Sequence, residues 1–237
     1  MKKAAIITGG AKRIGAAIAR HFASNGYDIA LHYNTSKTEA VALQKEIRTP
    51  GVDCQLFQQD LQKIPSLDPL IQKIHATMPH CTALINNASL FERATFMETD
   101  EALFDRQFTA NFKAPFFLSQ SFARHFAKGS IINLLDTDIA HTQGSHFAYL
   151  LSKKSLAEFT MMAARALGPH IRVNGVCPGI MLPSNELDEA YIEKLSKSLP
   201  LGQVGLVEQA ASSCLWLCEN SFVTGQFLFC DGGQHLL

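Results

Sequence analysis

The chain has 237 residues, 47% of them hydrophobic, and its 21 basic and 21 acidic side chains give a formal net charge of zero. This length suits one domain over residues 1–237 with a sizeable core. The balanced charge, without a polybasic run, argues against a nucleic-acid partner and an anionic membrane surface. No segment has the length of a membrane span, and the first apolar run leads into a glycine turn rather than a signal-peptide core. We therefore expect a cytoplasmic protein with a small-molecule partner.

Short apolar strands alternate with helical patterns along the chain. In chain order, strands are predicted at residues 4–8, 28–33, 53–58, 82–89, 130–135, 171–177 and 226–230. Helices are predicted at residues 13–26, 36–48, 66–78, 101–127, from before Tyr149 to about 167, and 207–218. This alternation predicts an α/β Rossmann fold, a doubly wound parallel sheet of about seven strands with helices on both faces. Residues 179–200 form the least core-like stretch and are a candidate substrate loop.

The six cysteines and nine histidines show neither paired CxxC spacing nor an HExxH arrangement. We interpret the cysteines as small buried side chains in a reducing compartment. A metal site is not expected.

The stretch "TGGAKRIG" (8–15) connects the first strand to the first helix. Gly9 permits the tight turn, and Gly15 allows the helix to pack closely on the sheet. The free N–H groups and positive dipole end of that helix suit a pyrophosphate. The stretch therefore predicts a dinucleotide-binding turn.

The second strand ends "LHYNTSK" (31–37), without the acidic residue that usually bonds the ribose 2′-hydroxyl of NAD. Lys12, Arg13 and Lys37 can supply positive charge for a 2′-phosphate, and Ser36 can donate a hydrogen bond. Lys37 has an equally good interpretation as a solvated lysine at a helix start. The pattern favours NADPH.

Motifs along the whole chain resemble those of the short-chain dehydrogenase/reductase family. They are "TGGAKRIG", Asp60 after the third strand, "NNAS" (86–89), Asn111, Tyr149 with Lys153 four residues later, "PG" (178–179) and "DGG" (231–233). The resemblance implies that Tyr149 protonates the substrate, that Lys153 lowers the pKa of this tyrosine and holds the cofactor ribose, and that Asn111 supports a water relay. Residues four apart share one helix face, and a neighbouring ammonium favours the phenolate over the phenol.

The resemblance also implies a cofactor site built from the loops that follow several strands. Asp60 is expected to contact adenine, and the backbone of Asn87 and Ala88 to lie along the ribose. The full expected cofactor set is Gly9, Lys12, Arg13, Ile14, Gly15, Tyr33, Asn34, Ser36, Lys37, Asp60, Leu61, Asn87, Ala88, Ser89, Tyr149, Lys153, Pro178 and Gly179. Family members are commonly tetramers, so a homotetramer is expected.

Two positions depart from the family pattern. Arg13 stands where the fingerprint usually has glycine, and Asp136 stands thirteen residues before Tyr149, where the family has a catalytic serine. An ionised aspartate can only accept hydrogen bonds and would repel a developing alkoxide, whereas it suits a nitrogen heterocycle whose C=N bond is reduced. Asp138, two residues on, is interpreted as exposed or structural.

One branch of the family makes this replacement, the pteridine reductases and the similar bacterial dihydromonapterin reductases. The stretch "NNASLF" (86–91) resembles their motif, which implies that Ser89 contacts pterin and cofactor and that Phe91 stacks on the pterin. The alternatives are that Phe91 anchors a loop in the core and that Asp136 only caps a loop. The arginine often found in the branch's 2′-phosphate segment is Thr35 here.

These observations predict an NADPH-dependent reductase of a dihydropterin, with dihydromonapterin or dihydrofolate as substrate. Asp136, Tyr149, Lys153 and Asn111 are the expected catalytic residues, and Ser89, Phe91, Asp136 and Tyr149 the expected substrate contacts. A carbonyl reductase of the ketoacyl or sugar type is the rival enzyme. A non-catalytic NADPH-binding sensor is the rival from another class.

Overall fold

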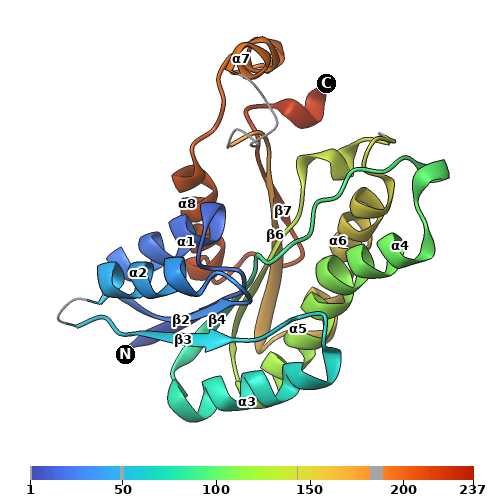
Figure 1. Cartoon of the computed structure of the whole chain (residues 1–237). Helices are drawn as coiled ribbons and strands as arrows, with labels where there is room; N and C mark the ends of the chain where they lie inside the picture. The colour runs from blue at the N-terminus through green and yellow to red at the C-terminus, as the bar shows by residue number, and fades with distance from the viewer. Residues whose placement is uncertain (1, 49–50, 143, 182–188) are drawn as a thin grey trace.

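The computed structural model describes residues 2–48, 51–142, 144–181 and 189–237. A sheet of seven parallel strands runs through the middle of the molecule in the order β3-β2-β1-β4-β5-β6-β7 (Figure 1). The strands are β1 (Lys3–Ile7), β2 (Tyr27–Tyr33), β3 (Cys54–Gln58), β4 (Cys81–Asn86), β5 (Gly129–Leu134), β6 (Ile171–Pro178) and β7 (Phe227–Cys230). The predicted Rossmann sheet is therefore confirmed.

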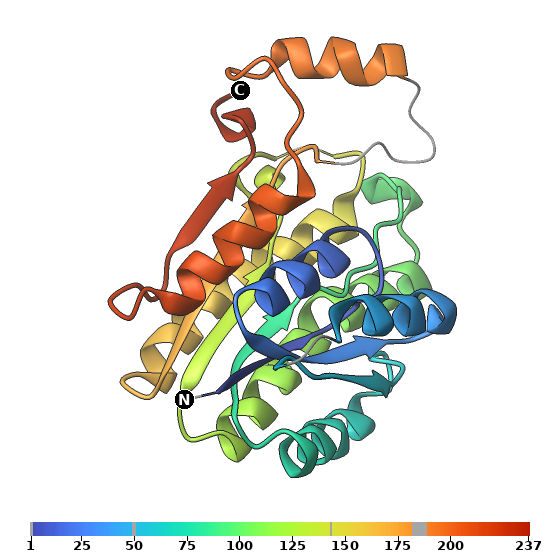
Figure 2. The ribbon, with the colours of Figure 1, turned by 90° about the vertical axis from the view of Figure 1, so that its left-hand side faces the viewer.

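Helices cover both faces of this sheet (Figure 2). They are α1 (Arg13–Ser24), α2 (Lys37–Ile47), α3 (Leu67–Thr77), α4 (Glu101–Phe108), α5 (Ala114–His125), α6 (Phe147–Leu167), α7 (Glu189–Ser198) and α8 (Val207–Glu219). Apolar side chains of α1, α2 and α8 pack on one face, and those of α3, α5 and α6 on the other. Each strand is joined to the next by a segment that contains a helix and returns over one face of the sheet. The strands are therefore parallel, and their carboxyl ends lie together at one edge of the sheet.

The predicted helix at 101–127 is helical without a break from Glu101 to His125, with one local change of geometry. Between α4 and α5 lies a π-helical turn, η3 (Thr109–Lys113), which contains the buried Asn111. Pro115 in the first turn of α5 has no N–H to donate, and this favours a local change of helical geometry. The π-helical turn therefore carries a side chain that lies in the protein interior.

Four shorter helical turns complete the described chain: η1 (Ile64–Ser66), η2 (Phe96–Glu98), η4 (Thr137–Ala140) and η5 (Gln234–Leu236). Part of the candidate substrate loop at 179–200, residues 182–188, lies outside the described residues, and α7 follows it. Within the described ranges, none of the helices is both long and apolar enough to cross a bilayer.

Candidate active site

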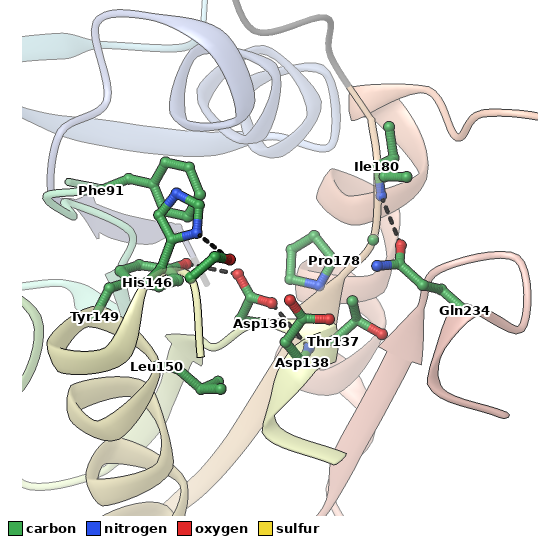
Figure 3. Close-up of a pocket in the computed structure, with 12 residues that line it drawn as sticks. Phe91, Asp136, Thr137, Asp138, His146, Tyr149, Leu150, Pro178, Ile180 and Gln234 are labelled. Atoms are coloured by element: carbon green, nitrogen blue, oxygen red, sulfur yellow. Dashed lines mark hydrogen bonds between the residues drawn. The ribbon is translucent and has the colours of Figure 1, made fainter. Parts of the chain in front are cut away.

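A cavity of about 260 Å³ opens at the carboxyl edge of the sheet, where parallel α/β folds place their ligands. Its walls come from the loop after β4, the turn after β5, the start of α6, the end of β6 and the C-terminal turn (Figure 3). The lining residues are Phe91, Asp136, Thr137, Asp138, Ser145, His146, Tyr149, Leu150, Pro178, Gly179, Ile180 and Gln234. The cavity thus unites Phe91, Asp136 and Tyr149, which were selected from distant parts of the sequence.

Asp136 and Tyr149 form the central contact of this cavity. The Tyr149 hydroxyl donates a hydrogen bond of 2.6 Å to Asp136 Oδ2, and the Asp138 backbone N–H donates one of 2.8 Å to Asp136 Oδ1 (Figure 3). Asp136 therefore caps η4 and holds the tyrosine with the same carboxylate. Asp136 thus does more than cap its loop, and its contact with substrate stays a prediction.

The pKa of Tyr149 is raised well above its ordinary value, first because the side chain is buried and then because it faces Asp136. This corrects the expectation that Lys153 brings the pKa down. The ammonium lies 5.8 Å from the centre of the tyrosine ring and donates a 2.7 Å hydrogen bond to the carbonyl of Leu134. Tyr149 consequently keeps its proton and can donate it.

Lys153 is buried in α6, one turn after Tyr149, at 3% exposure. Burial disfavours the ammonium and lowers the pKa of Lys153 to about 8, although the negative charge of Asp136 opposes this shift. Lys153 is therefore cationic at neutral pH, with its deprotonation close above.

Asn111 connects the loop after β4 to helix α6. Its Oδ1 accepts hydrogen bonds from the Leu90 N–H (2.8 Å) and from the Ser89 hydroxyl (3.0 Å). Its Nδ2 donates to the Leu90 carbonyl (2.9 Å) and to Ser152 Oγ (3.2 Å), and this serine donates to the Tyr149 carbonyl. Asn111 thus fixes the loop relative to the tyrosine, and its expected part in a water relay stays a prediction.

The glycine turn between β1 and α1 is tightly packed. A Cβ atom on Gly15 would lie 2.4 Å from the Gly9 carbonyl oxygen and 2.6 Å from Asn87 Nδ2. Asn87 Nδ2 donates hydrogen bonds to the carbonyls of Thr8 (2.9 Å) and Gly9 (3.1 Å). The side chain of Asn87 therefore shapes the turn, and only glycine fits at position 15.

Arg13, at the start of α1, has φ 50°, in the left-handed region that favours glycine. Its neighbour Lys12 forms an exposed 2.7 Å ion pair with Glu39 of α2, which the sequence argument did not foresee. Ser36 and Lys37 stand at the start of α2, and the Ser36 side chain makes no capping hydrogen bond. Three cations were expected to bind the 2′-phosphate. Lys12 is paired with Glu39, whereas Arg13 and Lys37 form no ion pair with this glutamate and can interact with a phosphate.

The other expected cofactor residues lie along the same edge of the sheet. Tyr33 ends β2 and is followed by Asn34, while Pro178 ends β6 and is followed by Gly179 on the cavity wall. Asp60, after β3, accepts a 3.0 Å hydrogen bond from the Gln62 N–H. Buried Leu61, partly buried Ile14 and Ala88, and exposed Ser89 complete the set.

His32 is a buried residue of β2 that the sequence argument missed. Its Nδ1 accepts a 3.1 Å hydrogen bond from the Gly9 N–H, so Nε2 carries the proton and donates at 2.9 Å to the Gln59 carbonyl. Burial lowers its pKa to about 4. A neutral imidazole therefore links the glycine turn to the end of β3, and only a lone histidine in an apolar strand signalled it.

Phe91 is 62% exposed, so it is not the core anchor of the alternative interpretation. Its ring stacks on His146, with centroids 4.2 Å apart and planes at 15°, and meets Tyr149 edge-on at 4.7 Å. His146 precedes α6 and also escaped the sequence argument. The two rings give the cavity an aromatic wall.

Asp138 also lines the cavity and is partly buried, so it is not the exposed residue of the first interpretation, while a structural role is compatible with its position. Its pKa is raised, first by burial and then by the charge of Asp136. Its Oδ1 is buried and has no hydrogen-bond partner among the described residues. The cavity therefore contains two carboxyl groups, where only one was predicted.

The C-terminal "DGG" segment supports the turn that carries both acids. Asp231 accepts hydrogen bonds from the Thr137 hydroxyl and from the N–H groups of Gly233 and His235. Burial opposes ionisation of Asp231, but these donors lower its pKa overall. Elsewhere, burial raises the pKa of Cys54 and of Cys81 to about 12, and all six cysteines carry free thiols. Among the described residues, no three His, Cys, Asp or Glu side chains are grouped to hold a metal ion.

The glycine turn after β1, together with the buried Tyr149–Lys153 pair, places the chain among oxidoreductases of the Rossmann fold. A family model described as enoyl-(acyl carrier protein) reductase matches residues 9–235. The chain belongs to the short-chain dehydrogenase/reductase family.

Known relatives point in two directions within this family. The crystal structure of FolM alternative dihydrofolate reductase 1 from Brucella suis, in complex with NADP, is similar, with a TM-score of 0.94, 33% identity and coverage of 99% of this chain and 95% of that one. By sequence, the chain is 30% identical to the uncharacterized oxidoreductase YohF of Escherichia coli, over 98% of this chain and 96% of the relative. It is 28% identical to the 3-oxoacyl-[acyl-carrier-protein] reductase FabG of Staphylococcus epidermidis over the whole of both chains.

Proposed function

We propose that this protein uses NADPH to reduce a dihydropterin to the tetrahydropterin. The observation that carries the proposal is the hydrogen bond from Tyr149 to Asp136, beside the exposed ring of Phe91. The reaction adds a hydride to the carbon and a proton to the nitrogen of a C=N bond. When bound, NADPH supplies the hydride.

The side chains of the cavity suit this chemistry better than ketone reduction. Tyr149 keeps its proton because burial and Asp136 raise its pKa, so it can deliver a proton to the ring nitrogen. After the transfer, a proton taken up from solvent can return to the tyrosinate through the Asp136 carboxyl group, and the ionised Asp136 can accept a hydrogen bond from a ring N–H. It cannot stabilise an alkoxide as a serine does.

Phe91 offers the flat apolar surface that a heteroaromatic ring requires. Stacking orients the ring and excludes water from one of its faces. One ring face of Phe91 stacks on His146, and because the side chain is 62% exposed and lines the cavity, the rest of the ring is available for this contact. Ser89, two residues earlier, lies in the same loop, and its hydroxyl donates a hydrogen bond to Asn111.

The cofactor proposal depends on the glycine turn and on the start of α2. The close packing at Gly15 leaves the backbone of the turn free to approach a pyrophosphate. Arg13, Ser36 and Lys37 would hold the 2′-phosphate, and the end of β2 has no carboxylate to repel it. Lys153 would hold the nicotinamide ribose. The NADP complex of the Brucella FolM protein supports this choice.

Dihydromonapterin and dihydrofolate are the candidate substrates, and the resemblance to the FolM protein favours them. The match to FabG instead favours a 3-oxoacyl reductase as the second candidate. The homotetramer and the cytoplasmic location stay predictions from the family resemblance.

The test is NADPH oxidation measured with a panel of dihydropterins, dihydrofolate and acetoacetyl thioesters. We expect turnover of dihydropterins, and a rise of about tenfold or more in their KM in Phe91→Leu, since stacking of a heterocycle on an aromatic ring contributes about 1–3 kcal/mol. Phe222→Leu removes a ring that is 99% exposed and serves as the matched control. Turnover of the thioesters alone would establish the FabG-like activity, and NADPH binding without any turnover would establish a sensor.

A further inference from the structure

Asp138 is a charged residue of the cavity to which the proposed chemistry assigns no role. It follows Asp136 by two residues on η4, and its backbone N–H is the donor that holds Asp136 Oδ1 (Figure 3). Its own Oδ1 is buried and has no hydrogen-bond partner among the described residues, so none of them neutralises this carboxylate at that atom. The negative charge of Asp138 also contributes to the raised pKa of Tyr149, so Asp138 interacts electrostatically with the proposed proton donor.

The rest of the cavity wall offers little positive charge to balance the two acids. None of the described residues that line the cavity is a lysine or an arginine. Lys153 is buried and is not among the lining residues, and its ammonium donates a hydrogen bond to the Leu134 carbonyl. A second anion brought to this wall would therefore meet a field from two carboxylates within a partly buried site, where charges are poorly screened.

We propose that Asp138 is a specificity-determining residue that selects substrates with an uncharged side chain over substrates with an anionic one. This inference rests on the proposed function and narrows it. Among the dihydropterins, the preferred substrates carry a short neutral substituent, such as a hydroxylated chain. The Asp138 carboxylate can accept hydrogen bonds from the O–H groups of such a chain. Dihydrofolate, whose glutamate adds two carboxylates, belongs to the disfavoured class. Selection of this kind works by repulsion of the wrong substrate.

The test compares kcat/KM for a dihydropterin bearing a neutral hydroxylated side chain with kcat/KM for dihydrofolate. In Asp138→Asn we expect the ratio of the two values to fall about fivefold or more, mainly through a lower KM for dihydrofolate, and Asp138→Lys should lower it further. In the wild type, added salt should also lower the ratio, because it screens the repulsion. Asp105→Asn removes one exposed carboxylate outside the cavity and should leave the ratio unchanged.

A structural role for Asp138 predicts a different pattern. Asp138→Asn retains the backbone N–H that bonds Asp136, and it removes a carboxylate whose ionised form burial disfavours, so its melting temperature should not fall. An unchanged ratio in both Asp138 variants, with dihydropterins still reduced, would overturn this inference and leave the proposed function intact. Absence of dihydropterin turnover in the wild type would instead overturn the proposed function.

Discussion

The hydroxyl of Tyr149 lies 2.6 Å from Asp136 Oδ2 and donates a hydrogen bond to that carboxylate. This distance is typical of a charge-assisted O–H···O⁻ hydrogen bond, which is about twice as strong as a neutral one. The twelve residues between the two positions include η4 and the start of α6. The pair therefore depends on the turn after β5 and on the helix start at the same time.

Replacing Asp136 with serine, the residue usual in the family, should lower dihydropterin turnover by about 10²–10⁴-fold, because the proton path loses its carboxylate. The same change should lower the pKa of Tyr149, since a nearby negative charge is removed. Steady-state kinetics and the phenolate absorbance titration measure the two effects. Tyr149→Phe removes this titration and identifies it. Unchanged dihydropterin turnover in Asp136→Ser would contradict the assignment.

The alkaline limb of the pH–rate profile should belong to Lys153. The cation is the form present below about pH 8 and is lost as the pH rises through that value, so kcat/KM for NADPH should decline above about pH 8. Tyr149 does not ionise in this range, because its pKa is raised. Lys153→Arg keeps a cation with a pKa above about 12 and should remove the alkaline limb, at a lower absolute rate. A limb that persists in this variant would assign it to another group.

Arg13 should lower the free energy of unfolding and increase the preference for NADPH over NADH. Its left-handed backbone, with φ 50°, is strained by about 1–2 kcal/mol for a residue with a Cβ, so Arg13→Gly should raise the free energy of unfolding by about 1 kcal/mol. The same variant should lose about tenfold in NADPH affinity and little in NADH affinity. Urea denaturation and fluorescence titration measure these quantities.

Arg13→Ala is the matched control for the two effects, because it removes the guanidinium and keeps the strained backbone. It should match Arg13→Gly in NADPH affinity without gaining stability. Equal stability of the two variants would show that the backbone strain is absent, and equal NADPH affinity of wild type and variants would remove Arg13 from the 2′-phosphate site.

His32 should make the folded protein sensitive to acid. Its pKa is about 4 when folded and about 6.5 when unfolded, so the unfolded chain binds the proton first as the pH falls. Its contribution to stability is complete above about pH 6.5, and about 3 kcal/mol is lost as the pH falls to about 4. Urea denaturation across this pH range measures the loss.

The comparison of two histidine variants isolates this effect from the carboxylates that titrate in the same range. His32→Leu should show a smaller loss of stability on acidification and weaker NADPH binding, since the Gly9 N–H loses its acceptor. His170→Gln, at an exposed position, should follow the wild type. An identical pH dependence of His32→Leu and wild type would show that this imidazole is not the titrating group.

Much of the fold could be predicted because strand and helix patterns depend on local periodicity. The seven strands lie within a few residues of their predicted ranges. The helix predicted over 101–127 contains the π-helical turn η3, which was not predicted. The effect of Pro115 on one turn leaves no mark in the hydrophobic pattern. The strand predicted over 82–89 ends at Asn86, where the loop that carries Ser89 and Phe91 begins.

The sequence by itself determined where the seven strands lie along the chain, where the glycine turn lies, and that Asp136, Tyr149 and Lys153 are candidate site residues. These features depend on spacing along strands and helices, which is a local property. Only the tertiary structure decided the direction of the Tyr149 pKa shift, because that depends on burial and on the hydrogen bond between the hydroxyl and Asp136. It likewise decided that His32 bonds Gly9, and that Asp138 faces the cavity. Electrostatic effects and hydrogen bonds act through space, between residues whose proximity the order of the chain does not express.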